Sequence, residues 1–116
     1  MIDDVTTSAL QMAVSGLAQR QRVIADNLAN IETPGFRAGR VTFENALQTA
    51  VRDGISPSSV TPTTARSLEP TRTDGNNVNI DEEVLSHTNT VMTYQLALRA
   101  LDSKYGLLRD VIKAGA

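Results

Sequence analysis

The side chains with the greatest potential for chemistry lie close together in the last third of this 116-residue chain. His87 is the only histidine, and Glu83 precedes it by four residues, about one helical turn. An imidazole and a carboxylate on adjacent turns of a helix are both possible metal ligands. No cluster of further ligands accompanies the pair, so we predict no metal site. We interpret His87 as a structural residue near a helix start, partly exposed or hydrogen-bonded.

Asp81, Glu82 and Glu83 form an acidic cluster that invites comparison with a general acid–base site. Carboxylates become catalytic when they are buried beside a substrate pocket, whereas in the first turn of a helix they already stabilise the helix dipole. A nucleophilic triad would need His87 as its base, and no aspartate can be identified to orient it. The chain has no glycine-rich phosphate loop and no cysteine, which excludes thiolate catalysis and cysteine-ligated zinc. We therefore predict no enzyme activity and no cofactor.

The distribution of charge argues against two classes of partner. The chain has 11 Lys and Arg against 13 Asp and Glu, a net charge of −2, and the two signs are interleaved. No basic run is present to follow a phosphate backbone, so we expect no nucleic acid partner. No stretch approaches the roughly 20 apolar residues of a membrane span, and none of signal-peptide length follows the acidic start of the chain. We expect neither membrane insertion nor a cleaved signal peptide.

Two long amphipathic helices are predicted, at residues 7–31 and 79–114. Apolar residues recur in both at alternating spacings of three and four, which is a heptad pattern. Gln21 interrupts the first pattern, and it either sets the register of the helix pair or merely faces a gap or solvent. Asn79 is expected to cap the second helix, with Glu82 completing a capping box. The predicted packing seams are Leu10, Val14, Leu17, Ile24 and Leu28 in the first helix, and Val84, Val91, Tyr94, Leu98, Leu101, Tyr105, Leu108 and Ile112 in the second.

The middle of the chain is predicted to contain a turn, a short helix and a connector. Residues 33–36, Thr-Pro-Gly-Phe, fit a type II turn that needs a positive φ at Gly35. A short helix should follow within residues 32–53, capped by Thr42 and ended by Gly54. In the segment from Gly54 to Gly75, 14 of 22 residues are Ser, Thr, Pro or Gly, so we expect residues 54–78 to be a flexible connector or to order only against partners. The expected fold is one all-α unit over residues 1–116, with the terminal helices as an antiparallel, coiled-coil-like pair.

The run from Ile24 to Ala38 resembles the signature of the flagellar axial proteins, the family of rod and hook subunits. That signature ends a helix with Ala-Asn-x-x-Thr-x-Gly followed by Phe or Tyr. The segments Arg20–Leu28, Val41–Leu47 and Asp74–Asp81 resemble the proximal-rod branch of this family, as does Tyr94–Gln95 followed by Lys104 and Leu108. The similarity covers most of residues 8–112 outside the Pro/Ser/Thr-rich middle. The residues of the motif are Asn27, Leu28, Ala29, Asn30, Thr33, Pro34, Gly35 and Phe36.

The resemblance implies a structural subunit of the proximal rod in the flagellar basal body. Such subunits are exported without processing through the flagellum's type III apparatus, and many copies stack helically into the drive shaft that transmits torque. The implied location is the rod in the periplasmic space. The implied partners are copies of the chain, other rod proteins, and components of the inner-membrane ring or export gate.

The motif itself has a plain and a functional interpretation. Taken alone, it is an ordinary helix stop followed by a tight turn, and the flanking matches favour the family. In that case Asn27 and Asn30 bond carbonyls exposed at the helix end, and Phe36 anchors the bend against this or a neighbouring subunit. Two other functions stay open: another rod protein of the same family, and a soluble coiled-coil adaptor or chaperone. The adaptor would be a stable folded dimer in isolation.

Overall fold

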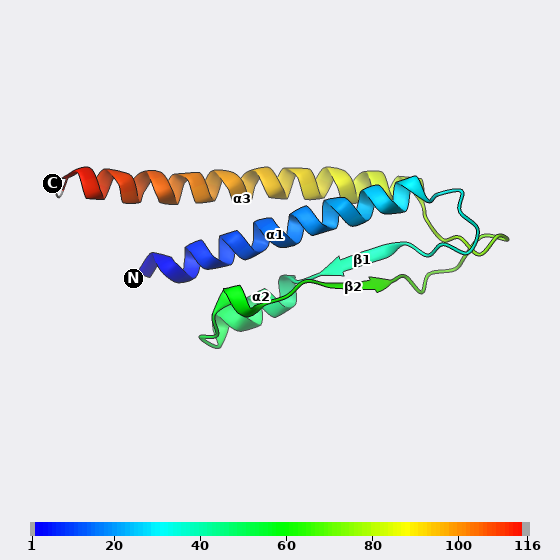
Figure 1. Ribbon diagram of the computed structural model, residues 1–116, viewed down its shortest axis with the longest axis horizontal. Coiled ribbons are helices and arrows are strands. Elements are labelled where there is room, and N and C mark those ends of the chain that lie inside the picture. Colours follow the sequence, from blue (N-terminus) through cyan, green and yellow to red (C-terminus); the bar gives the residue numbers. More distant parts are fainter. Residues whose placement is uncertain (1, 115–116) are drawn as a thin grey trace.

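The computed structural model describes residues 2–114, and its elements form three layers in an elongated molecule of 66 × 26 × 15 Å (Figure 1). Helix α1 lies in the middle, with helix α3 on one side and a hairpin with a short helix on the other. None of the helices in the described part combines the length and the apolar character that a bilayer crossing requires. In chain order the elements are α1 (Ile2–Ala29), β1 (Gly39–Thr42), α2 (Glu44–Arg52), the 3-10 turn η1 (Pro57–Ser59), β2 (Thr63–Arg66) and α3 (Ile80–Ala114).

Helices α1 and α3 pack against each other in opposite directions (Figure 1). Near one end of the pair Asn27 Nδ2 donates to Glu83 Oε2 at 3.1 Å, and near the other Gln11 Nε2 donates to the Tyr105 hydroxyl at 2.7 Å. The predicted antiparallel pair of long helices is therefore confirmed. The Asn79 side chain accepts from the amides of Asp81 and Glu82, as the predicted cap requires.

The face of α3 that lies against α1 is rotated by one residue from the apolar pattern of the sequence. A row at every seventh position, Glu83, Thr90 and Ala97, is buried. Polar and small side chains in this row hydrogen-bond to α1 or let the two helices approach closely. Of the predicted seam, Leu101 is buried and Val91 and Tyr94 are half-buried. The other members are 40% to 65% exposed: Val84, Leu98, Tyr105, Leu108 and Ile112.

The prediction of an all-α fold is wrong, because the middle of the chain forms a two-stranded antiparallel sheet. Gly39 pairs with Arg66 and Thr42 with Thr63. The second strand and the 3-10 turn lie inside residues 54–78, where the composition predicted a flexible connector. Its threonines favour extended backbone, and its ordering depends on pairing with β1, a long-range contact that composition does not reveal.

A small core joins the hairpin and α2 to α1. Phe43 and Val41 pack with Met12 and Leu17 of α1. Gly16 lies directly under the Phe43 ring, where a Cβ would come within 2.6 Å of a ring carbon. Because Thr42 belongs to β1, it does not cap α2; the cap position is Phe43, which makes no side-chain capping bond.

The far end of α2 follows its prediction. Gly54 has a φ of 73°, and the Ile55 amide donates to the Ala50 carbonyl at 2.8 Å. This is the Schellman arrangement, which ends a helix at a left-handed glycine.

Candidate functional site

The turn at residues 33–36 has the geometry that its sequence requires. Gly35 has a φ of 74°, and the Phe36 amide donates to the Thr33 carbonyl at 3.2 Å. As predicted, the Asn30 side chain hydrogen-bonds a carbonyl at the end of α1: its side-chain amide donates to the Asp26 carbonyl at 2.8 Å. The turn thus redirects the chain from α1 into the hairpin.

A second loop, residues 67–79, interlocks with this turn at the tip of the molecule. Asn76 is fully buried, and its side-chain amide donates to the carbonyls of Asn30 at 2.8 Å and Thr33 at 2.9 Å. The Gly35 amide donates to the Asp74 carbonyl at 2.8 Å. The loop therefore satisfies the carbonyls that the end of α1 exposes.

Asn77 ties the same loop to the start of the hairpin. Its side-chain oxygen accepts from the Ala38 amide at 2.7 Å, and its side-chain nitrogen donates to the carbonyls of Ser67 and Glu69. The two segments that carry the sequence motif and the Asp74–Asp81 element, some forty residues apart in the chain, therefore form one hydrogen-bonded unit.

Asn27 has a different role from the one predicted for it. Its side chain is fully buried and bonds both backbone groups of Gly39, accepting from the amide at 2.8 Å and donating to the carbonyl at 3.1 Å. It also donates to Glu83, whose other carboxylate oxygen lies 2.7 Å from Arg40 Nη1. This buried group joins α1, β1 and α3 at one point.

The pattern of residues did not reveal this arrangement. The sequence predicts that Glu83 stabilises the helix dipole from the first turn of the helix, and it does not predict that the side chain is fully buried, as the structure shows. The sequence feature that could have revealed the burial of Glu83 is its seven-residue spacing to Thr90 and Ala97. This row is too polar to be recognised as a packing seam. Asp81 and Glu82 are exposed.

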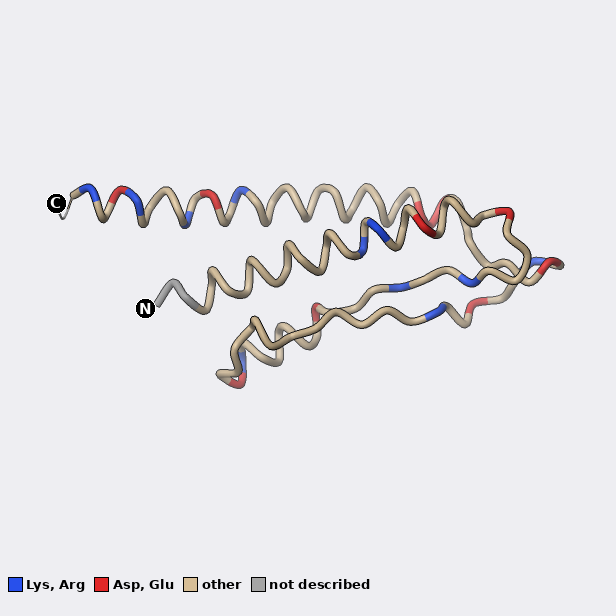
Figure 2. Tube along the Cα trace, in the orientation of Figure 1, with Lys and Arg blue, Asp and Glu red and all other residues tan. Residues whose placement is uncertain are grey.

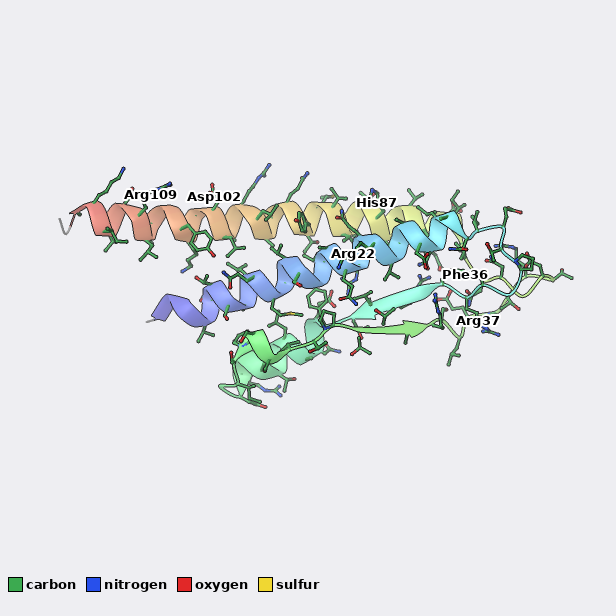
Figure 3. All side chains as sticks on the ribbon, viewed as in Figure 1. Arg22, Phe36, Arg37, His87, Asp102 and Arg109 are labelled. Carbon is green, nitrogen blue, oxygen red and sulfur yellow. The ribbon has the colours of Figure 1, made fainter. Side chains whose placement is uncertain are left out.

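The structure gives no support to a metal site at Glu83 and His87. His87 is exposed (Figure 3), whereas the Glu83 carboxylate is engaged with Asn27 and Arg40. Within residues 2–114, no group of three or more His, Cys, Asp or Glu side chains is placed to hold a metal ion.

An ion pair fixes α1 to the hairpin on the other side. Arg20 lies over the Phe43 ring, 5.0 Å from its centre, and donates to both carboxylate oxygens of Glu44 at 2.6 and 2.8 Å. The same guanidinium donates to the Val41 carbonyl at 2.6 Å. The hydrogen bond from Arg20 lowers the pKa of Glu44 to about 2, against a partial desolvation that raises it.

The remaining predicted site residues divide between the buried seam and the surface. In α1, Leu17 and Ile24 are buried, and the rest of its predicted seam is half-buried, as is Gln21. Phe36 is half-buried beside Arg66, whose guanidinium lies 5.1 Å from the ring centre. The motif residues at the surface are Ala29, Thr33, Pro34 and Gly35.

Comparison with known proteins points to one family. Residues 8–37, the stretch that ends in the tip turn, match the family described as flagella basal body rod protein. The chain is 30% identical to flagellar basal body rod protein FlgB of Escherichia coli K12, over 90% of this chain and 91% of that protein. It is 35% identical to FlgB of Borrelia hermsii, over 84% and 87%, and 29% identical to FlgB of Bacillus subtilis, over 95% of each.

Proposed function

The chain belongs to the flagellar basal body rod protein family, and its relatives include FlgB proteins. We propose that it is a structural subunit of the proximal rod. The similarity extends over nearly the whole length of both chains, so it includes the terminal helices as well as the matched motif. The family is structural, and the function follows from the packing of subunits.

The observation that carries this function is the apolar surface that α3 leaves uncovered in a single chain. A monomeric protein rarely exposes so long an apolar strip, and such strips mark protein interfaces. In a rod this surface would be covered by neighbouring subunits. Five of the exposed side chains, Leu85, Met92, Leu96, Leu107 and Val111, recur at spacings of four, seven and eleven residues and form this strip on one face of the helix. Val84, Leu98, Leu108 and Ile112 lie on other sides of the helix, and all nine are 40% to 67% exposed.

We propose that the neighbours are copies of this chain, other rod proteins, and components of the inner-membrane ring or export gate. The interlocked tip supports this assignment. Its hydrogen bonds hold the end of α1 and the start of α3 in a fixed relative orientation, so each subunit would present the same face to its neighbours. We also propose that the chain is exported through the flagellum's own apparatus without a cleaved leader, and membership of the same family supports this proposal.

The test is deletion of the gene in its host, with basal bodies isolated and counted by electron microscopy. Loss of rods and filaments, restored by the wild-type gene, is the expected result. The matched control is complementation with a frameshifted gene, which should restore nothing. Normal basal bodies in the deletion strain would overturn the proposal.

A further inference from the structure

The most exposed large apolar side chain among the described residues lies outside α3. This side chain is Leu68, which is 92% exposed and lies two residues after the end of β2. The residue before it is firmly held: Ser67 is buried, its amide donates to the Ala38 carbonyl at 2.8 Å, and its carbonyl accepts from Asn77 at 3.2 Å. The Ser67 hydroxyl also accepts from the Glu69 amide at 3.1 Å. Leu68 is therefore presented to solvent by an ordered backbone, so binding through it would cost little ordering entropy.

Two guanidinium groups lie beside Leu68. Arg37 Nη1 donates to the Ser67 carbonyl at 3.5 Å, and Arg66 Nη1 donates to the Arg37 carbonyl at 3.1 Å while its guanidinium stacks over Phe36. Among residues 2–114, neither guanidinium forms an ion pair with a carboxylate. Figure 2 shows basic positions before and on β1 and at the end of β2, with an acidic position after β2. We define Phe36, Arg37, Arg66 and Leu68 as the tip patch.

The composition of the tip patch is that of an interface centre. Arginine and phenylalanine are enriched at protein interfaces, and the positions that carry most of the binding energy lie in well-packed pockets near the interface centre. Guanidinium groups held by backbone and ring contacts are preorganised for paired hydrogen bonds to carboxylates.

We propose that the tip patch docks onto another basal body protein whose surface has an apolar pocket for Leu68 and carboxylates facing Arg37 and Arg66. An anionic membrane surface fits less well, because surface binding draws on clusters of about four to eight basic residues. The tip patch has two, and Glu69 follows Leu68 directly in the chain. This inference rests on the proposed rod function and adds a contact separate from the apolar strip of α3.

The test places a photo-crosslinking amino acid at position 68 of the full chain, expressed in its host, and isolates basal bodies after irradiation. Immunoblotting first measures whether the chain is present in basal bodies, which tests the rod function independently. Mass spectrometry then identifies the attached peptide. We expect a peptide of a different basal body protein with carboxylates near the attachment point. Attachment to another copy of this chain, to phospholipid or to nothing would overturn the tip patch alone, whereas absence of the chain from basal bodies would overturn both proposals.

A charge reversal provides the second arm. Arg37→Glu should lower the crosslink yield about tenfold or more, because loss of the contact with a partner carboxylate should weaken binding at least about tenfold. Thr71→Glu adds a negative charge at another exposed position of the same loop and should leave the yield unchanged. Equal yields from the two variants would overturn the charge complementarity on which the inference depends.

Discussion

At the scale of single residues, replacing glycine by alanine is predicted to change the free energy of unfolding in opposite directions at two positions. A Cβ at Gly16 would lie 2.6 Å from a carbon of the Phe43 ring, whereas at Gly106 its nearest neighbour is the flexible end of Arg109, 3.7 Å away. Gly16→Ala should lower the free energy of unfolding by about 1–3 kcal/mol, because the ring has to move in a packed core. Gly106→Ala should raise it by roughly 0.5–1 kcal/mol through helix propensity. Urea unfolding followed by circular dichroism measures both, and a stabilised Gly16→Ala would contradict the packing.

The buried carboxylate of Glu83 is expected to matter far more than its exposed neighbour. Glu83→Ala would leave Arg40 without its buried partner and Asn27 with an unpaired donor, which should cost roughly 3–5 kcal/mol. Glu82, which is 3.4 Å from Arg40 and half exposed, should cost less than about 1 kcal/mol on replacement by alanine. Similar losses from the two variants, measured by the same unfolding experiment, would show that Glu83 is not buried as described.

The ion pair between Arg20 and Glu44 should make stability depend on pH in acid. Because the folded pKa of Glu44, about 2, lies below its ordinary value of 4.5, the pair stabilises the folded chain above pH 4.5. That contribution is lost as the pH falls from 4.5 towards 2. The Glu44 side chain is 58% exposed, so solvent screening limits the cost of Glu44→Gln at pH 7 to about 1 kcal/mol or less. The difference between wild type and Glu44→Gln should shrink across this interval, and a constant difference would exclude the pair as its source.

At the scale of elements, the tip turn depends on the backbone of Gly35. There is open space around the position of its Cβ, so only the positive φ of 74° opposes a side chain there. Gly35→Val should cost about 1–2 kcal/mol locally, since a β-branched residue is strongly disfavoured in this region. We expect fewer assembled rods and reduced swimming. Gly35→Asn, which tolerates the left-handed conformation, is the matched control, and normal rods from Gly35→Val would reject the proposed role of the turn.

Periodicity predicts the two long helices, whereas proline and glycine residues predict the turn at residues 33–36 and the end of α2. The hairpin was missed because β1 and β2 are four residues each and are separated by α2, so neither has enough alternation to be recognised alone. The face of α3 was predicted one residue away from its observed position, because apolar periodicity gives no weight to a row such as Glu83, Thr90 and Ala97. For the candidate site, sequence similarity identified both tip segments, but only the structure shows that Asn76 and Asn77 join them.

At the scale of the whole molecule, one chain buries too little of its apolar surface to be stable in the manner of a compact domain. The layers are thin, the shortest dimension being 15 Å, and the last part of α3 exposes Leu107, Val111 and Ile112. In the rod, binding of neighbours would add to the stability of the helical pair, because association that covers this surface stabilises the folded form. Before assembly the end of α3 should therefore be the least stable part of the chain.

These considerations predict a weakly folded monomer whose helicity increases on assembly. Far-UV circular dichroism of the purified chain should show a thermal transition with a low midpoint, and sedimentation at the same concentration should show a single chain. Val111→Lys, on the exposed face of α3, should leave the circular dichroism of the isolated chain unchanged and reduce incorporation into basal bodies. Ala97→Lys, which places a charge in the buried row, should reduce helicity in isolation as well. A cooperative, strongly helical dimer that Val111→Lys dissociates would instead support the soluble adaptor, since the apolar strip would then serve one permanent partner.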